Sequence, residues 1–229
     1  MLEPTEPKRL LITRTLPGME STGQRTEGRD RIPADLLLRR KAARRLVLDC
    51  RRERNAIEQL LTLPAESESL HFIVDGRFEP CDLIPAIRRL SHPATIARLD
   101  ISTLGFNTDN VATIARGMDQ QKIGQVLLIC SHYFSKAEPA AFQNLQQEIG
   151  GRGGRVAALR THAKLMLLEM TDGRCFTIEG SGNLRSCRSI EQFVLANDRP
   201  LLLFHRTWLD EYLATCQKNA ASNVSPAKT

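Results

Sequence analysis

From residue 70 onward, the chain alternates between short apolar runs and segments in which apolar residues recur at helical spacing. Apolar runs of four to eight residues bounded by turn residues are typical of strands, and apolar residues at every third or fourth position are typical of helices. Strands that alternate with helices form layered α/β domains, so we predict a mixed β-sheet flanked by helices. The expected strands are 70–74, 95–104, 123–130, 155–159, 165–168, 175–178 and 190–195, and the expected helices are 80–90, 108–118, 139–149 and 200–216.

Composition and apolar spacing divide the chain into four parts. Residues 1–33 mix Pro, Gly, Ser, Thr and alternating charges without a period, and we expect them to be disordered. Residues 34–66 combine many bases with apolar residues at helical spacing, which predicts a basic amphipathic helical region ending before Pro64. Residues 67–218 hold the expected α/β domain, and residues 219–229 are an expected disordered tail.

The composition disfavours a membrane protein and a disulfide scaffold. With 229 residues, of which 41% are hydrophobic, the chain can bury the core of one ordinary domain. It lacks the run of about eighteen apolar residues that a membrane helix needs, so we expect no membrane partner. The N-terminus lacks the basic-then-apolar order of a secretory signal. The six cysteines are scattered without metal-ligand spacing, and we expect reduced thiols and a cytoplasmic location.

The formal charge of +6 is concentrated rather than spread evenly. A basic surface indicates a polyanionic partner, and nucleic acid is the commonest one. The alternative is a solvated, Arg-rich helix face. The bases are Arg39, Arg40, Lys41, Arg44, Arg45, Arg51, Arg52 and Arg54, with Arg152 and Arg155 further along the chain.

Residues 161–191 carry the clearest chemical pattern. His162-Ala163-Lys164 precedes an apolar run, and Gly180-Ser181-Gly182-Asn183 follows a second run after a Thr-Asp-Gly turn. The two runs predict a β-hairpin that brings the small-residue loop near His162 and Lys164, which share a face if they lie on a strand. With Glu191 added, the side chains suit chemistry at a phosphate ester. Either motif alone is commonplace, but their order and spacing together favour an active site.

At these residues the chain resembles the phospholipase D superfamily, whose signature is HxK, four residues, Asp, and then GSxxN or GSxN. The resemblance covers residues 70–193. The chain departs from the signature at Glu169, which stands where the family has Asp, and in a longer spacing from there to Gly180. Because that Asp is regarded as structural in the family, we expect the departure to alter the hairpin geometry before the chemistry. The specific matches are His162, Lys164, Gly180, Ser181, Asn183 and Glu191.

The resemblance implies a metal-independent phosphodiesterase, and the small single-motif bacterial endonucleases of the superfamily are the most similar members. His162 is then the expected nucleophile, which forms a phosphohistidine. Lys164, Ser181 and Asn183 are expected to hold the non-bridging oxygens, and Glu191 to orient the imidazole. No metal or cofactor is expected. The expected substrate-binding residues are Gly180, Gly182, Arg185, Arg188, Arg152 and Arg155.

A single HxK triplet implies a second copy of the chain. Family members usually carry two motifs, because one imidazole attacks phosphorus and another protonates the leaving oxygen. No other histidine begins an HxK triplet, so we expect a homodimer with a composite site. His132 and Tyr133 end an apolar strand, where ligands gather in α/β sheets, but a site role for them is the less favoured interpretation.

Three functions compete. The first is a nuclease, with DNA favoured over RNA as the substrate. The second is a catalytically weak or silent relative that binds nucleic acid or a partner protein. The third, a lipid-cleaving enzyme, is disfavoured because the sequence has no membrane segment or exposed aromatic belt.

Overall fold

The computed structural model describes residues 37–39, 44–48, 60, 62–74, 78–185 and 189–222. The chain divides into two units, Met1–Asp30 and Arg31–Thr229. The first unit lies outside the described residues, and everything below concerns the second.

The described part of the chain forms one mixed sheet in the order β1-β2-β3-β9-β8-β7-β4-β5-β6. Three neighbouring pairs are parallel, namely β2 with β3, β4 with β5 and β5 with β6, and the other five pairs are antiparallel. The strands are β1 (Leu37–Arg39), β2 (Arg44–Leu48), β3 (Ser69–Val74), β4 (Ile96–Thr103), β5 (Ile123–Ser131), β6 (Arg155–Leu159), β7 (Leu165–Met170), β8 (Cys175–Gly180) and β9 (Glu191–Asn197).

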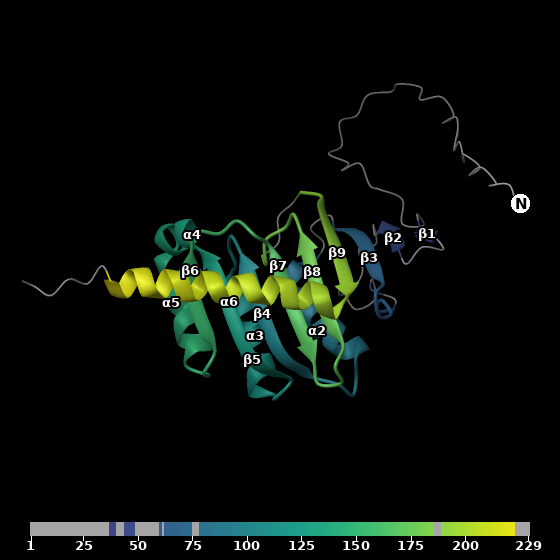
Figure 1. Ribbon diagram of the computed structural model, residues 1–229, viewed down its shortest axis with the longest axis horizontal. Helices are drawn as coiled ribbons and strands as arrows, with labels where there is room; N and C mark the ends of the chain where they lie inside the picture. Colours follow the sequence, from purple (N-terminus) through teal and green to yellow (C-terminus); the bar gives the residue numbers. More distant parts are fainter. Residues whose placement is uncertain are drawn as a thin grey trace, which may run out of the picture. The chain divides into compact units, whose positions relative to one another are not determined.

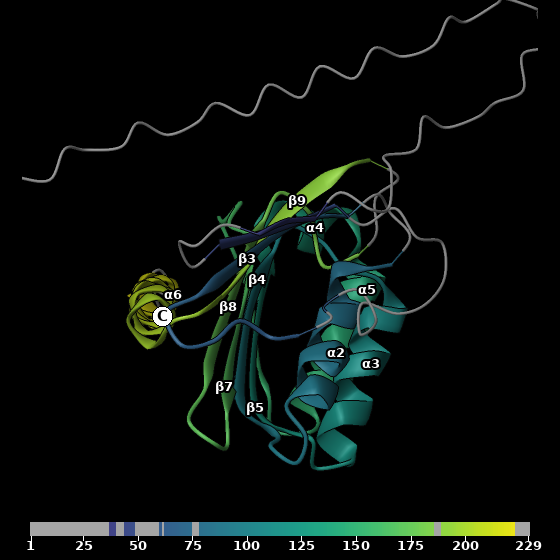
Figure 2. The same cartoon turned by 90° about the vertical axis from the view of Figure 1, so that its right-hand side faces the viewer.

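Helices cover both faces of the sheet. Figure 2 shows α2, α3 and α5 on one face and α6 on the other, and in Figure 1 α6 runs across the strands. The α/β class, the mixed sheet and the flanking helices predicted from the sequence are therefore confirmed. The helices are α2 (Leu83–Leu90), which follows a 3-10 turn (Pro80–Asp82), α3 (Thr108–Asp119), α4 (His132–Ala137), α5 (Pro139–Leu145), which continues into a π turn (Gln146–Gly150), and α6 (Arg199–Ser222).

Two apolar layers hold the sheet between these helices. The larger layer includes Met166, Leu168 and Ile178 and lies under α2, α3 and α5. The smaller layer joins Leu165 and Leu167 to the inner side of α6. Because alternate residues of β7 serve opposite layers, the strand reads as a continuous apolar run, which is the pattern of a strand covered on both faces.

The prediction of helices in residues 34–63 is wrong where the structure describes this region. Leu37–Arg39 and Arg44–Leu48 are strands, and Arg44–Leu48 pairs in parallel with β3. The run Leu46-Val47-Leu48 can extend an existing sheet edge, and such tertiary pairing overrides local helical spacing. Residues 40–43, 49–59 and 61, which include most of the predicted basic cluster, lie outside the described residues.

Two further differences concern helices. His132–Ala137 form the helix α4, whereas the sequence predicts that His132 and Tyr133 end a strand. Ser131 caps this helix by accepting a hydrogen bond from the Phe134 amide at 3.0 Å. Helix α6 continues to Ser222, past the start of the tail predicted at residue 219.

Candidate active site

His162 and Lys164 lie in the loop between β6 and β7, just before the strand predicted at residues 165–168. The loop is held from three sides. The Thr161 amide donates to the Leu159 carbonyl at 2.9 Å. The Ser102 hydroxyl of β4 donates to the Ala163 carbonyl at 3.0 Å, and the Tyr212 hydroxyl of α6 donates to the Arg160 carbonyl at 3.0 Å. Three hydrogen bonds thus fix a segment that has no regular structure of its own.

The two side chains are in contact within this loop. Lys164 Nζ lies 3.2 Å from His162 Nδ1 and 3.3 Å from the His162 carbonyl oxygen. An ammonium can only donate, so Nδ1 accepts in this contact and the ring proton resides on Nε2. The predicted convergence of imidazole and ammonium is therefore present.

The Gly-Ser-Gly-Asn loop begins where β8 ends, and both of its glycines are needed for packing against β9. A Cβ on Gly180 would lie 2.2 Å from Cδ1 of Phe193, and one on Gly182 would lie 2.7 Å from Cζ of the same ring. The small residues thus let the Phe193 ring close over the loop. This explains the glycines without assigning them a direct role at a ligand.

Ser181 ties this loop to the start of β9. Its hydroxyl donates to Glu191 and accepts a hydrogen bond from the Gln192 amide at 3.1 Å. The Ser181 amide also donates to the Gln192 carbonyl at 3.1 Å. Ser181 and Glu191 are thus in contact, and the hydroxyl is engaged with the carboxylate.

Asn183 and Lys164 line the same small pocket at the end of the hairpin. Oδ1 of Asn183 is buried and has no hydrogen-bond partner among the described residues. The amide oxygen and nitrogen are interchangeable by a flip of the side chain, so either group can be presented to the pocket. A buried polar group without a partner is costly. The pocket beside it has about 10 Å³ of space, which is enough for about one water molecule. The pocket is lined by Pro80, Ile101, Ser102, Thr103, Lys164, Leu165, Met166, Ile178, Gly180, Gly182, Asn183, Leu184 and Phe193.

Of the predicted basic contacts, Arg185 lies beside this site. Its guanidinium carbon is 5.6 Å from the centre of the Phe134 ring of α4, and the side chain is exposed. Arg188 lies outside the described residues.

The structure does not bring Arg152 and Arg155 to the site. They lie before and at the start of β6, whereas His162 follows its end, about 13 Å further along an extended strand. Arg152 donates to both carboxylate oxygens of Asp119, at 2.8 and 3.0 Å, and to Glu148 at 2.7 Å. These bonds hold the pKa of the Asp119 carboxyl below its usual value. Arg155 lies 3.5 Å from Asp210.

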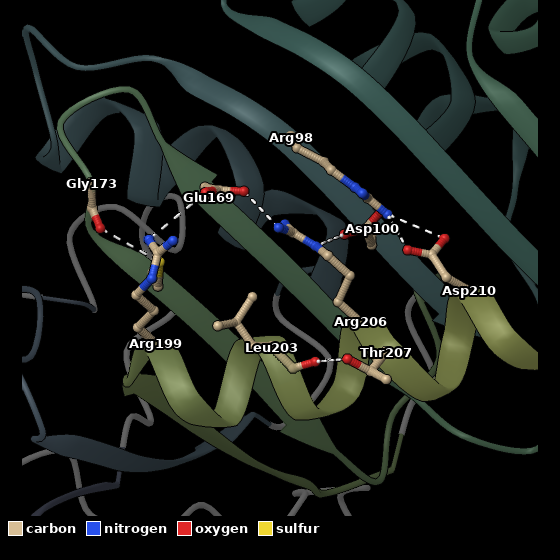
Figure 3. A network of polar contacts seen from close by, with 10 residues as sticks. Arg98, Asp100, Glu169, Gly173, Arg199, Leu203, Arg206, Thr207 and Asp210 are labelled. Atoms are coloured by element: carbon tan, nitrogen blue, oxygen red, sulfur yellow. Dashed lines mark hydrogen bonds and ion pairs between the residues drawn. The ribbon is translucent and has the colours of Figure 1, made fainter.

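Glu169, the departure from the family signature, belongs to an ion network under α6 (Figure 3). It lies on the same face of β7 as Leu165 and Leu167, and its carboxylate accepts from Arg206 at 2.6 Å. Arg206 also donates to Asp100 at 2.9 Å. The acid at this position therefore fastens α6 to the sheet.

Asp100 is the centre of that network. Its side chain has no exposed surface, and it accepts from Arg98 at 2.8 Å as well as from Arg206. Burial lowers the pKa of Arg98, but the bonds to Asp100 and Asp210 outweigh burial and raise it. The Arg98 guanidinium thus remains charged beneath the helix.

Several residues that shape the site carry no signal in the sequence. Ser102 and Tyr212 support the loop of His162 through hydrogen bonds to residues 61 and 52 positions away along the chain. Phe193 closes over the glycines from β9. His132 begins α4 at the end of β5, on the same edge of the sheet, and is exposed.

Two searches of the described residues give negative findings. No group of three or more His, Cys, Asp or Glu side chains is placed to hold a metal ion among them. Within the same residues, no helix is both long and apolar enough to cross a membrane.

No protein-family model matches the sequence, and no curated protein matches it either. Two solved structures share part of the fold. One is TrmBL2, an archaeal chromatin protein, with a TM-score of 0.41 and 10% identity over 63% of this chain and 52% of that one. The other is a polyphosphate kinase from Porphyromonas gingivalis, with a TM-score of 0.45 and 12% identity over 70% of this chain and 27% of that one. This chain spans about half the length of the first and about a quarter of the second.

Proposed function

We propose that this chain is a metal-independent phosphodiesterase of the phospholipase D type that cleaves nucleic acid, with DNA favoured over RNA. The observation that carries the proposal is the meeting of two separate motifs at one edge of the sheet. Lys164 contacts His162 and lines one pocket with Asn183, whose buried Oδ1 has no partner among the described residues. A fixed cation and an amide beside an imidazole suit the non-bridging oxygens and the phosphorus of a phosphodiester.

In the first step, the substrate phosphate displaces Lys164 from the imidazole. The ammonium moves onto a non-bridging oxygen, which frees Nδ1 of His162 to take the proton and Nε2 to present its lone pair. Nε2 then attacks phosphorus, a P–N bond forms, and the P–O bond to the leaving group breaks. Glu191, which starts β9 beside Ser181, is proposed to hold the Nδ1 proton.

A second imidazole completes the reaction. It gives a proton to the leaving oxygen, then takes one from a water molecule that attacks phosphorus and breaks the P–N bond. We assign this role to His162 of a second copy across a two-fold axis. Exposed apolar residues at this edge, Tyr133 at 77% and Ile190 at 61% exposure, offer a surface that a second copy can cover.

Arg185 supports the choice of a polyanionic substrate. Its exposed guanidinium rests on Phe134 beside the Gly-Ser-Gly-Asn loop, and it forms no ion pair with any described residue. An arginine held on an aromatic ring is well placed to contact a flanking phosphate.

The runner-up is a catalytically weak or silent protein that binds nucleic acid or a partner. The contact of Lys164 with Nδ1 favours it, because that contact occupies the atom that must be protonated for attack. An assay of DNA cleavage distinguishes the two functions, because the runner-up predicts binding without cleavage.

The test is to incubate the purified full chain with labelled single- and double-stranded DNA in EDTA. We expect cleavage by the wild type and none by His162→Ala, while His132→Ala, a change to an exposed histidine on the same edge, keeps its activity. When wild-type and His162→Ala chains are mixed, the remaining activity should be proportional to the fraction of wild-type homodimers. Binding without cleavage would favour the runner-up. Activity restored only by magnesium, or full activity from a monomer in ultracentrifugation, would contradict the proposal.

A further inference from the structure

A second cavity lies away from the candidate active site, between α2 and α3. It is a groove of about 300 Å³ whose floor includes Ile96 and Ile123, the first residues of β4 and β5. The candidate active site lies past the other end of β4, where Thr103 bonds the loop that holds Asn183. At about 3.3 Å per residue, the seven steps along β4 separate the two by about 23 Å. The groove is therefore a site of its own.

Three cationic side chains border this groove. Arg88 comes from the last turn of α2, Arg116 from the last turn of α3, and Lys122 from the turn before β5. Among the described residues, no carboxylate forms an ion pair with any of the three, whereas Arg152 nearby is paired twice. Lys122 donates to the Gln120 amide at 2.6 Å, which holds its ammonium at the groove. Unpaired cations from three elements around one cavity favour an anionic ligand.

The other residues that line the groove indicate the character of the rest of the ligand. Ile84, Ile96 and Ile123 form an apolar floor. Gly117 lets Ile123 pack against α3, since a Cβ there would lie 2.5 Å from Ile123 Cδ1. At one end, the Asp82 carboxylate already accepts the Glu79 amide at 2.9 Å and retains a free oxygen for a further donor. A volume of about 300 Å³ is at the lower limit for small-molecule pockets, which suits a compact ligand.

We propose that this groove binds a small phosphorylated molecule with a flat apolar body, of which a mononucleotide is the simplest. The phosphate contacts Arg88, Arg116 and Lys122, the body lies on the isoleucine floor, and an amino or hydroxyl group donates to Asp82. The proposal does not depend on the phosphodiesterase activity, since no residue is shared between the two sites.

Calorimetry with the full chain tests this, using AMP, adenosine and inorganic phosphate as separate probes. We expect AMP to bind at least about tenfold more tightly than either of its two parts, because it alone contacts both the cations and the floor. Arg116→Gln and Lys122→Gln should each weaken AMP binding by about tenfold. Arg89→Gln, on the exposed side of the same helix as Arg88, should leave AMP binding unchanged.

Thermal unfolding and circular dichroism identify any variant that does not fold, in which case the other cation variant decides the result. Phosphate binding as tightly as AMP would show that the apolar floor is not used and would overturn the assignment. Loss of AMP binding in Lys164→Gln but not in Arg116→Gln would place the nucleotide at the other site. Failure of AMP to bind at about 10 mM, where even a millimolar ligand saturates, would also refute the proposal.

Discussion

The ion network under α6 makes a quantitative prediction about stability. In Arg206→Met, the aliphatic stem is kept and the guanidinium is removed, so packing changes little. Asp100, which has no exposed side-chain surface, loses one of its two guanidinium partners, and Glu169 loses its 2.6 Å bond. Breaking a buried ion pair typically costs about 3–5 kcal/mol, because a charge is left uncompensated.

The lower end of that range applies here. Asp100 keeps its 2.8 Å bond to Arg98, and the Glu169 side chain is 29% exposed, so water can solvate part of it. We therefore expect a loss of about 3 kcal/mol in unfolding free energy, which lowers Tm by about 6–12 °C in a chain of this size.

Thermal and urea unfolding followed by circular dichroism measure this loss. Arg152→Met is the matched control, because it removes an arginine that is also paired twice, with Asp119 and Glu148, but on the surface. Surface pairs contribute little, so the control should leave the unfolding free energy nearly unchanged. If Arg206→Met costs no more than Arg152→Met, the network does not hold α6 to the sheet and our argument is wrong.

Three further predictions concern the Gly-Ser-Gly-Asn loop, the half-buried Asp82 and the proposed chemistry. Gly180→Ala should cost about 1–3 kcal/mol in unfolding free energy, because the added Cβ would overlap the Phe193 ring; an unchanged urea midpoint would show that the ring has room to move. Burial raises the pKa of the Asp82 carboxyl, so ionisation opposes folding: the stability is fully present below the unfolded pKa of 3.8 and is lost as pH rises through the folded pKa. Asp82→Asn should therefore unfold at a higher temperature than the wild type at pH 7, with the difference disappearing near pH 3, and equal melting at both pH values would contradict this. Lys164→Ala and Asn183→Ala should each lower kcat by about a hundredfold with little change in KM, since donors to developing charge act in the transition state; a loss confined to KM would show that they only hold the ligand.

The apolar spacing within each segment was enough to predict most of the helices and strands. The hairpin of β7 and β8 and the helices from α2 to α6, apart from α4, lie where periodicity placed them, because each is a contiguous segment with its own apolar spacing. The strands at Leu37–Arg39 and Arg44–Leu48 were not predictable in this way. They exist by pairing with one another and with β3, and local spacing does not contain that information.

The same distinction between local and tertiary information applies to the candidate site. His162, Lys164, the Gly-Ser-Gly-Asn loop and Glu191 could be identified from the order of residue types, since the chemistry of each side chain is local. Arg152 and Arg155 are adjacent to this segment in sequence, and β6 nevertheless separates them from it. Proximity along the chain is a poor guide once an extended strand intervenes.

By itself, the sequence determined which chemical groups the chain can offer and the class of fold that presents them. The tertiary structure alone decided that Tyr212 and Ser102 hold the loop of His162, that Phe193 requires both glycines, and that Glu169 serves α6. It also placed three cations around a groove between α2 and α3. These contacts join residues that are far apart along the chain, and only the packing of helices on the two faces of the sheet brings them together.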